Sequence, residues 1–337
     1  MSIVLLRCVL ICTYFFICFG FIASGEFLQG KYTQHRTISV DPSSGTSFST
    51  IQSAIDSVPS NNHNWISIYI KAGVYNEQVK IPPDKGFIRL NGEGMGKTSV
   101  VWGAHDTMLT SSTFESMADN IVVSGITFVN SYNYPPSTNK NPVKPAVAAK
   151  ISGDKSAFYE CGFLGYQDTL LDDAGRHYFN YCYIEGATDF IFGGGQSIYE
   201  KCSIKVNVGE KVSGSIGFIA AQARASSNDD GGFVFKQCNV TGNGKAFLAR
   251  AWKPYSRVIY YNSFLSEIVV PQGWDAWNYV GHENQITFAD DQCQGPGSDK
   301  SNRVKWEKNL SPEELQLFTS NSYIDNDGWM HKIPLNI

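Results

Sequence analysis

The sequence predicts an all-β protein built as a single-stranded solenoid, a parallel β-helix with short helices at its two ends. Three observations support this prediction. A strand-plus-cysteine unit recurs through the middle of the chain, its strands are rich in β-branched and aromatic residues, and helical patterning is confined mainly to the ends. Strands of four to six residues broken by Gly, Asn and Asp leave no room for regular crossover helices.

The repeated unit is an apolar or aromatic strand, then Cys, then a further alternating apolar position. Its copies are 157–163 (AFYECGF), 178–184 (YFNYCYI), 198–204 (IYEKCSI) and 233–240 (FVFKQCNV). A fifth copy, 258–264 (VIYYNSF), has Ser in place of Cys. An earlier segment, 120–130 (NIVVSGITFVN), has a similar pattern of apolar strand residues. Successive cysteines stand 21, 20 and 36 residues apart, so the third interval holds an insertion. A period near 20 made of strands and turns favours stacked coils. An antiparallel sandwich would not normally keep one residue type at one place in successive units.

Helical patterns flank this repeat. Residues 49–58 (STIQSAIDSV) place apolar side chains at helical spacing, and Ser311 followed by Pro312 resembles an N-cap with proline at the first helical position. Solenoids need covered ends, so we expect the N-terminal helix to act as a cap.

The chain begins with an apolar stretch that we interpret as a signal peptide, residues 1–25, ahead of one β-helix domain, residues 26–337. One Arg is followed by an apolar run that closes on small residues, as at a cleavage point. A retained signal anchor is the alternative, because the run is near membrane-spanning length, roughly 20 residues. We therefore expect a secreted, extracellular protein.

Charge and cysteine content limit the partners and cofactors. The formal charge is −4 and the basic residues are scattered, so a nucleic-acid partner is not expected. There are no CxxC pairs and the histidines lack ligand spacing, so we expect no metal and no cofactor.

Five cysteines follow the predicted signal peptide. Secretion permits up to two disulfides and one free thiol. Cys161 and Cys182 are the first candidate pair, as a disulfide or a close stack, because equivalent places in adjacent coils put their Cα atoms about one strand spacing apart, ~4.8 Å. Cys202 and Cys238 are the next pair, which leaves Cys293 free. Two N-glycosylation sequons stand at Asn239 and, less favourably because Pro312 follows, at Asn309.

Two aspartates occupy the same place in adjacent units. Asp168 and Asp189 each lie seven residues after the cysteine of their unit. Stacked parallel strands are ~4.8 Å apart, so both carboxylates should project from one face of a β-helix. Two close carboxylates drive each other's pKa values apart, which suits one as an acid and the other as a nucleophile or base. Turn capping is the alternative role, but bulky and amide side chains surround both residues rather than Gly and Ser.

Four segments resemble the signature segments of plant pectin methylesterases, in that family's order. They are 73–77 (GVYNE), 166–170 (YQDTL), 189–193 (DFIFG) and 248–252 (LARAW). The similarity runs from about Ile38 to the C-terminus. It implies a right-handed parallel β-helix that acts on methyl-esterified homogalacturonan in the cell wall.

The resemblance also implies roles for individual residues. Asp189 matches the nucleophile and Asp168 the general acid/base. Gln167 matches a donor to the oxyanion, and Arg250 an arginine that holds the nucleophile. The residues assigned on this basis to substrate binding are Trp252, Trp274, Phe192 and Tyr166.

The sequence departs from the family's pattern in three places. Pro145 stands where the family often has Gln, so one expected oxyanion donor is missing. Ala249 and Ala251 replace a common Gly and a frequent Pro beside Arg250. Many relatives carry an inhibitory pro-region, and here we expect none, because the catalytic segment follows the predicted signal peptide almost directly.

We therefore predict a secreted pectin methylesterase, an aspartyl esterase that modifies the cell wall during pectin degradation. It should act as a monomeric glycoprotein on methyl-esterified pectin, and a proteinaceous pectinesterase inhibitor is an expected partner. Two alternatives stay open at this point. One is a pectin-cleaving glycosidase with the same two aspartates, and the other is a catalytically silent wall-binding protein, suggested by Pro145.

Overall fold

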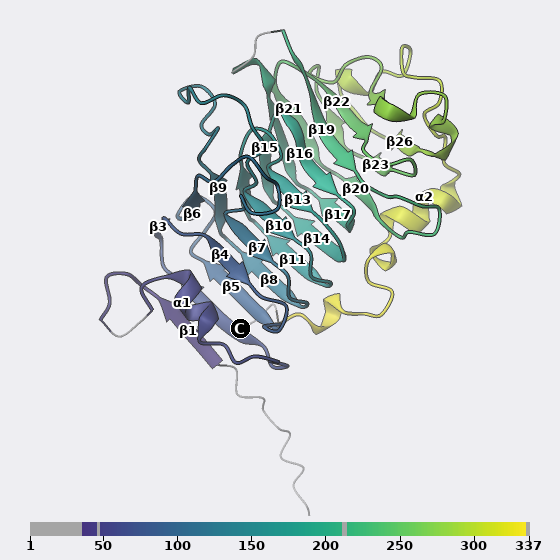
Figure 1. Ribbon diagram of the computed structural model, residues 1–337. Coiled ribbons are helices and arrows are strands. Elements are labelled where there is room, and N and C mark those ends of the chain that lie inside the picture. The colour runs from purple at the N-terminus through teal and green to yellow at the C-terminus, as the bar shows by residue number, and fades with distance from the viewer. Residues whose placement is uncertain (1–35, 46–47, 211–213, 335–337) are drawn as a thin grey trace, which may run out of the picture. The chain divides into compact units, whose positions relative to one another are not determined.

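The computed structural model describes residues 36–45, 48–210 and 214–334, and the predicted signal peptide lies outside them. Three parallel sheets wrap around one interior, as Figure 1 shows. The predicted parallel β-helix is therefore confirmed. No helix among the described residues has the length and apolar character needed to cross a membrane.

The three sheets are named here by their size or role. The ten-stranded sheet contains β1 (Arg36–Val40), β2 (Ile66–Ile70), β5 (Ile88–Gly92), β8 (Ile121–Ser124), β11 (Ser156–Tyr159), β14 (Arg176–Asn180), β17 (Gln196–Glu200), β20 (Gly232–Lys236), β23 (Arg257–Tyr261) and β26 (Thr287–Asp291). The site sheet contains β4 (Val79–Ile81), β7 (Phe114–Ser116), β10 (Ala149–Ile151), β13 (Leu170–Asp172), β16 (Thr188–Gly193), β19 (Ile216–Gln222), β22 (Lys245–Ala251) and β25 (Trp274–Asp275). The third sheet contains β3 (Gly73–Tyr75), β6 (Thr98–Trp102), β9 (Thr127–Asn130), β12 (Gly162–Leu164), β15 (Tyr183–Gly186), β18 (Ser203–Asn207), β21 (Asn239–Asn243) and β24 (Phe264–Leu265).

Each central coil visits the sheets in the same order. The chain passes from β11 of the ten-stranded sheet to β12 of the third sheet and β13 of the site sheet, then begins the next coil at β14. The register repeats with the sequence: Phe158 pairs with Phe179, and Phe163 with Ile184. The steps of 20 and 21 residues are thus consecutive coils, as predicted.

The cysteine of each unit follows a tight corner between the ten-stranded and third sheets. The residue before it adopts a left-handed conformation, with φ of 52° at Glu160, 52° at Tyr181 and 55° at Lys201. The thiols of Cys161 and Cys182 point inward and donate to backbone carbonyls of the preceding coil, at 3.6 Å and 3.4 Å. The stack continues through Cys202, Cys238 and Ser263, each hydrogen-bonded to the coil before it.

Of the disulfide or close stack predicted for Cys161 and Cys182, the structure shows the stack. Neither this pair nor Cys202 and Cys238 forms a disulfide, since all five described cysteines are free thiols. Side chains at equivalent places of in-register parallel strands point in the same direction. Their Cβ atoms therefore keep the ~4.8 Å strand spacing rather than the ~3.8 Å of a disulfide. The thiols stack and bond to carbonyls instead.

An aromatic stack fills the interior beside the thiols. Phe158, Phe179, Tyr199, Phe235 and Tyr260 occupy equivalent places, with successive ring centroids 5.1, 4.5, 4.8 and 4.4 Å apart. These separations follow the strand spacing, so the repeat stacks the rings without further adjustment. The stacked rings therefore form part of the core enclosed by the sheets.

Both terminal helices begin as the sequence predicts. Helix α1 (Ile51–Asp56) is capped by Thr50, and α2 (Pro312–Thr319) by Ser311 in a capping box with Glu314. The C-terminal segment covers the outer face of the ten-stranded sheet through Leu315, Ile324, Trp329 and Ile333. The short 3-10 helices are η1 (Val208–Glu210), η2 (Trp277–Tyr279), η3 (Glu283–Gln285), η4 (Pro296–Ser298), η5 (Asn321–Tyr323) and η6 (Met330–Lys332).

Candidate active site

A cleft on the outer face of the site sheet brings both aspartates together. Its lining residues are Met108, Pro145, Gln167, Asp168, Asp189, Phe192, Ala221, Arg250, Trp252 and Trp277. They come from β16, β19 and β22 and from the loops that lead into or out of the neighbouring strands. The four assigned catalytic residues, Gln167, Asp168, Asp189 and Arg250, thus share one cleft.

Asp168, just before β13, and Asp189, on the neighbouring β16, share a conformation that few residues adopt. Gln167 pairs with Thr188, and Leu170 with Ile191, so Asp168 and Asp189 lie side by side. Both are left-handed, with φ of 61° and 48°. Asp tolerates this region better than most side chains, and such strained positions gather at functional sites. The conformation helps to lift both carboxylates out of the normal alternation of a strand.

An irregularity in strand pairing marks the same place. The register between β16 and β19 shifts between Thr188 and Ile191, so the segment that carries Asp189 has one residue more than the facing strand. Bulges of this kind re-aim side chains and occur next to active sites. Asp189 therefore projects into the cleft rather than into the core.

Asp168 is set up to hold a proton near neutral pH. It is buried, with 6% of its surface exposed. Burial, followed by the negative charge of Asp189, raises the pKa of the Asp168 carboxyl to about 7, against the opposing charge of Arg250. A carboxyl group with such a pKa can serve as a general acid.

Asp189 has a different environment because Arg250 binds it directly. The Nε of Arg250 donates to Oδ1 of Asp189 at 2.7 Å, and Nη2 donates to Oδ2. Burial raises the pKa of the Asp189 carboxyl above its usual value, and the hydrogen bonds and the charge of Arg250 oppose this rise. Since Arg250 favours the ionised form and Asp168 has no such partner, Asp189 is the carboxyl that ionises first.

Apolar side chains form the floor of the cleft. Val147, Leu171, Phe192 and Ala221 make one buried cluster, with Met108 and Trp252 packed against it. The rings of Phe192 and Trp252 lie 6.0 Å apart. A methyl ester or the apolar face of a sugar ring would fit against this surface. Phe192 and Trp252, two of the residues assigned to substrate binding, thus lie at the cleft.

Two of the residues assigned to substrate binding lie outside the cleft. Trp274 is only 1% exposed and packs inside the solenoid against Tyr260 and Phe288, at 6.1 Å and 5.1 Å. Its strand pairs it with Ala249, which faces inward, whereas Asp275 pairs with Arg250 of the cleft. Alternation along β25 therefore turns Trp274 into the core.

Tyr166 is likewise an interior residue. It is 3% exposed, and its hydroxyl donates to the carbonyl oxygen of Val208 at 3.1 Å. Its backbone carbonyl accepts from Ala187 at 2.7 Å, which ties the coil of Asp168 to that of Asp189. Tyr166 supports the site from below and does not line it.

Sequence reasoning missed three residues of the cleft, Trp277, Met108 and Ala221. Trp277 stands three positions after Trp274 and lies in η2, with 37% of its surface exposed. The motif 271–277 (PQGWDAW) contains both tryptophans, so counting the strand register from Arg250 could have distinguished them. Nothing in the local sequence marks Met108 or Ala221.

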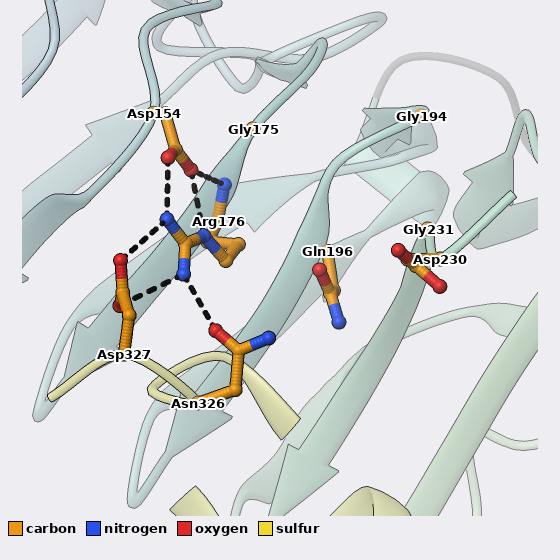
Figure 2. A pocket seen from close by; sticks show the side chains of 9 residues that line it. All are labelled: Asp154, Gly175, Arg176, Gly194, Gln196, Asp230, Gly231, Asn326 and Asp327. Carbon is orange, nitrogen blue, oxygen red and sulfur yellow. Dashed lines mark hydrogen bonds and ion pairs between the residues drawn. The ribbon is translucent and has the colours of Figure 1, made fainter. Parts of the chain in front are cut away.

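A second pocket is more polar and lies elsewhere. Figure 2 shows Arg176 between Asp154 and Asp327, with Gln196 and Asp230 farther along the same groove. Arg176 forms ion pairs with Asp154 at 2.6 Å and with Asp327 at 3.0 Å. These contacts join β14 to the C-terminal segment, so the charges of Arg176, Asp154 and Asp327 have a structural role.

Comparisons with known proteins agree with this geometry. The family model described as Pectinesterase matches residues 37–327. The chain is 53% identical to Probable pectinesterase 29 of Arabidopsis thaliana over 308 residues, which cover 91% of each chain. It is 52% identical to Probable pectinesterase 55 of the same plant over 300 residues, covering 88% of this chain and 91% of the relative.

The fold has a close counterpart among solved structures. The pectin methylesterase from carrot superposes with a TM-score of 0.82 at 28% identity, covering 90% of this chain and 98% of that one. The chain therefore belongs to the pectinesterase family of carboxylic ester hydrolases.

Proposed function

We propose that the protein hydrolyses the C6 methyl esters of homogalacturonan, with Asp189 as nucleophile and Asp168 as general acid and base. The observation that carries this proposal is the pair of adjacent carboxyls with different partners: Arg250 bonds to Asp189, while Asp168 has its pKa raised to about 7. Such an arrangement separates a nucleophile from an acid at one pH.

The first half of the reaction forms an acyl-enzyme. The Asp189 carboxylate attacks the ester carbonyl carbon, and Gln167 donates a hydrogen bond to the oxygen that becomes negative. The bond to the methoxy oxygen then breaks, and neutral Asp168 gives its proton to that oxygen so that methanol leaves. The product of this half is an anhydride between Asp189 and the galacturonate C6.

The second half consumes one water. Asp168, now ionised, takes a proton from water while the water oxygen attacks the galacturonate carbonyl of the anhydride. Collapse of this intermediate frees Asp189 as a carboxylate and releases a carboxylic acid that loses its proton to solvent. Asp168 ends protonated, ready for the next ester.

The proposed location rests on the apolar N-terminal stretch of the sequence, and the proposed partners rest on the family. We propose a secreted, extracellular protein of the cell wall that acts as a monomer on methyl-esterified pectin and is open to a proteinaceous inhibitor. Asn239 and Asn309 are both exposed, which suits their proposed glycosylation. The polymeric substrate requires an open cleft, and the lining residues occupy an outer face of the solenoid.

Methanol release from highly methylated homogalacturonan, measured together with new reducing ends, tests the proposed function. We expect methanol without new reducing ends. New reducing ends would indicate a glycosidase that uses the two aspartates across a glycosidic bond. Binding without either product would indicate a wall-binding protein.

The pH dependence gives a first prediction. Asp168 must carry a proton to release methanol, so the rate should fall as the pH rises through about 7, the pKa of its carboxyl. Asp189 must be ionised to attack, so activity should also fall on the acid side. A pH profile of kcat/KM, which reports the free enzyme and the steps up to methanol release, should be bell-shaped. A rate that keeps rising well above pH 7 would contradict the acid role of Asp168.

Pro145 gives a second prediction. It lines the cleft, and the next residue, Ala146, donates its backbone N–H to the Gln167 carbonyl at 3.2 Å. Pro145→Gln adds a side-chain donor beside Gln167, and we expect kcat to rise roughly tenfold, since one oxyanion donor can contribute more than that. Pro145→Met, with similar bulk and no N–H donor in its side chain, is the control. An unchanged kcat in Pro145→Gln would mean that existing donors already satisfy the oxyanion.

A further inference from the structure

Arg250 crosses an entire strand to reach Asp189. Arg250 lies on β22 and Asp189 on β16, with β19 between them. Neighbouring strands are ~4.8 Å apart, so β22 and β16 are separated by roughly 10 Å, and the side chains of Arg250 and Asp189 bridge this separation together. The residue of β19 that pairs with both Phe192 and Arg250 is Ala221, whose small side chain leaves room for this path.

Two aromatic rings enclose the guanidinium along this path. Its Cζ atom lies 4.2 Å from the centroid of the Phe218 ring and 3.7 Å from that of Trp277. Phe218 is itself stacked on Phe247, with centroids 5.4 Å apart and planes at 8°. The guanidinium of Arg250 therefore contacts two aromatic rings, while its edge donates to Asp189.

Phe218 also stands where the pairing of the site sheet becomes irregular. It pairs with Thr188, the residue before Asp189, and the register shifts immediately afterwards. One residue thus contacts the guanidinium and borders the bulge that carries the carboxylate. A long, flexible arginine held in this way loses little further freedom when it binds Asp189, and water is kept from its faces.

We propose that Phe218 and Trp277 form a clamp that positions Arg250 across β19 and so keeps Asp189 ionised and correctly aimed. The proposal rests on the proposed nucleophilic role of Asp189. Both aromatic residues act through Arg250, so they are positioning residues. Loss of the Phe218 ring would let the guanidinium move and weaken its two hydrogen bonds to the nucleophile.

Phe218→Leu is the direct test, because it keeps the apolar bulk and removes the ring. We expect kcat on methylated pectin to fall about tenfold with KM within about twofold, the scale of a desolvated cation–π contact. The acid limb of the pH profile should move to higher pH, because a less stabilised Asp189 carboxylate protonates more readily. Phe218→Tyr restores the ring and should recover most of the loss.

Phe318→Leu is a matched control. It removes a comparable contact, 4.8 Å between Phe318 and the guanidinium of Arg257, outside the cleft. Its kcat and pH profile should match the wild type. Trp277→Leu is the second test variant, because Trp277 is 37% exposed and its replacement leaves the solenoid interior intact. It should reproduce the loss even where Phe218→Leu fails to fold.

A readout independent of activity is the Nε–H signal of Arg250 in protein labelled with ¹⁵N-arginine, assigned by its absence in Arg250→Lys. We expect a signal that is shifted by the two rings and slow to exchange in the wild type and in Phe318→Leu. It should shift and exchange faster in Phe218→Leu and in Trp277→Leu. A wild-type protein that releases no methanol would overturn the proposed function. An Arg250 signal and kcat unchanged in either clamp variant would overturn the clamp alone.

Discussion

Asp189→Asn is expected to abolish methanol release, with a fall in kcat of about 10⁴-fold or more, the scale seen when a nucleophile is removed. The amide cannot form the anhydride, and it leaves the Arg250 guanidinium facing a neutral group. Pectin binding should persist, because the floor of the cleft is formed by Phe192, Trp252 and their neighbours rather than by the carboxylate.

The control for this variant is Asp299→Asn, which changes the same group at an exposed position outside the cleft. It should retain wild-type kcat and binding. Thermal unfolding of both variants separates a chemical loss from a folding defect. Near wild-type methanol release by a folded Asp189→Asn protein would show that the proposed mechanism is wrong.

Asp168→Asn is expected to lower kcat by roughly 10²–10⁴-fold, the usual contribution of acid and base assistance. The amide neither protonates departing methanol nor activates water. The hydrogen bonds from Arg250 to Asp189 do not involve Asp168, so Asp189 should remain ionised. The residual rate is therefore the informative quantity.

The pH profile of the residual rate distinguishes this role from a structural one. In the wild type the rate should fall through about pH 7, the pKa of the Asp168 carboxyl. In Asp168→Asn that alkaline limb should disappear, because the group that titrates is gone. A residual rate that keeps the same alkaline limb would assign it to another residue.

Much of the fold could be predicted because the repeat encodes it. The coils that begin with β11 and β14 each place a Cys after a left-handed residue at the same corner, so the spacing of Cys161 and Cys182 reports the coil length directly. The same spacing relates Asp168 to Asp189, and it predicted their adjacency without any other information. The sequence repeat therefore predicts that the proposed nucleophile and acid lie next to each other.

Side-chain orientations and local strand register could not be predicted, because the spacing of the repeat does not determine them. The orientation of Trp274 follows from its pairing with Ala249, and the projection of Asp189 from a register shift. Cys161 and Cys182 are adjacent but remain free thiols, because their Cα–Cβ bonds point in the same direction and not toward each other. Phe218 lies in the 36-residue interval between cysteines, where the repeat is interrupted and gives no register.

The division of labour between the aspartates can be tested by rapid acid quench of the enzyme with methyl-esterified oligogalacturonate, followed by peptide mass spectrometry. We expect that, in the first turnover, the peptide containing Asp189 gains the mass of the galacturonoyl group. The peptide containing Asp168 should stay unmodified, and the adduct should be absent in Asp189→Asn. A first-turnover burst of methanol in which the acyl group is found on the Asp168 peptide would contradict it.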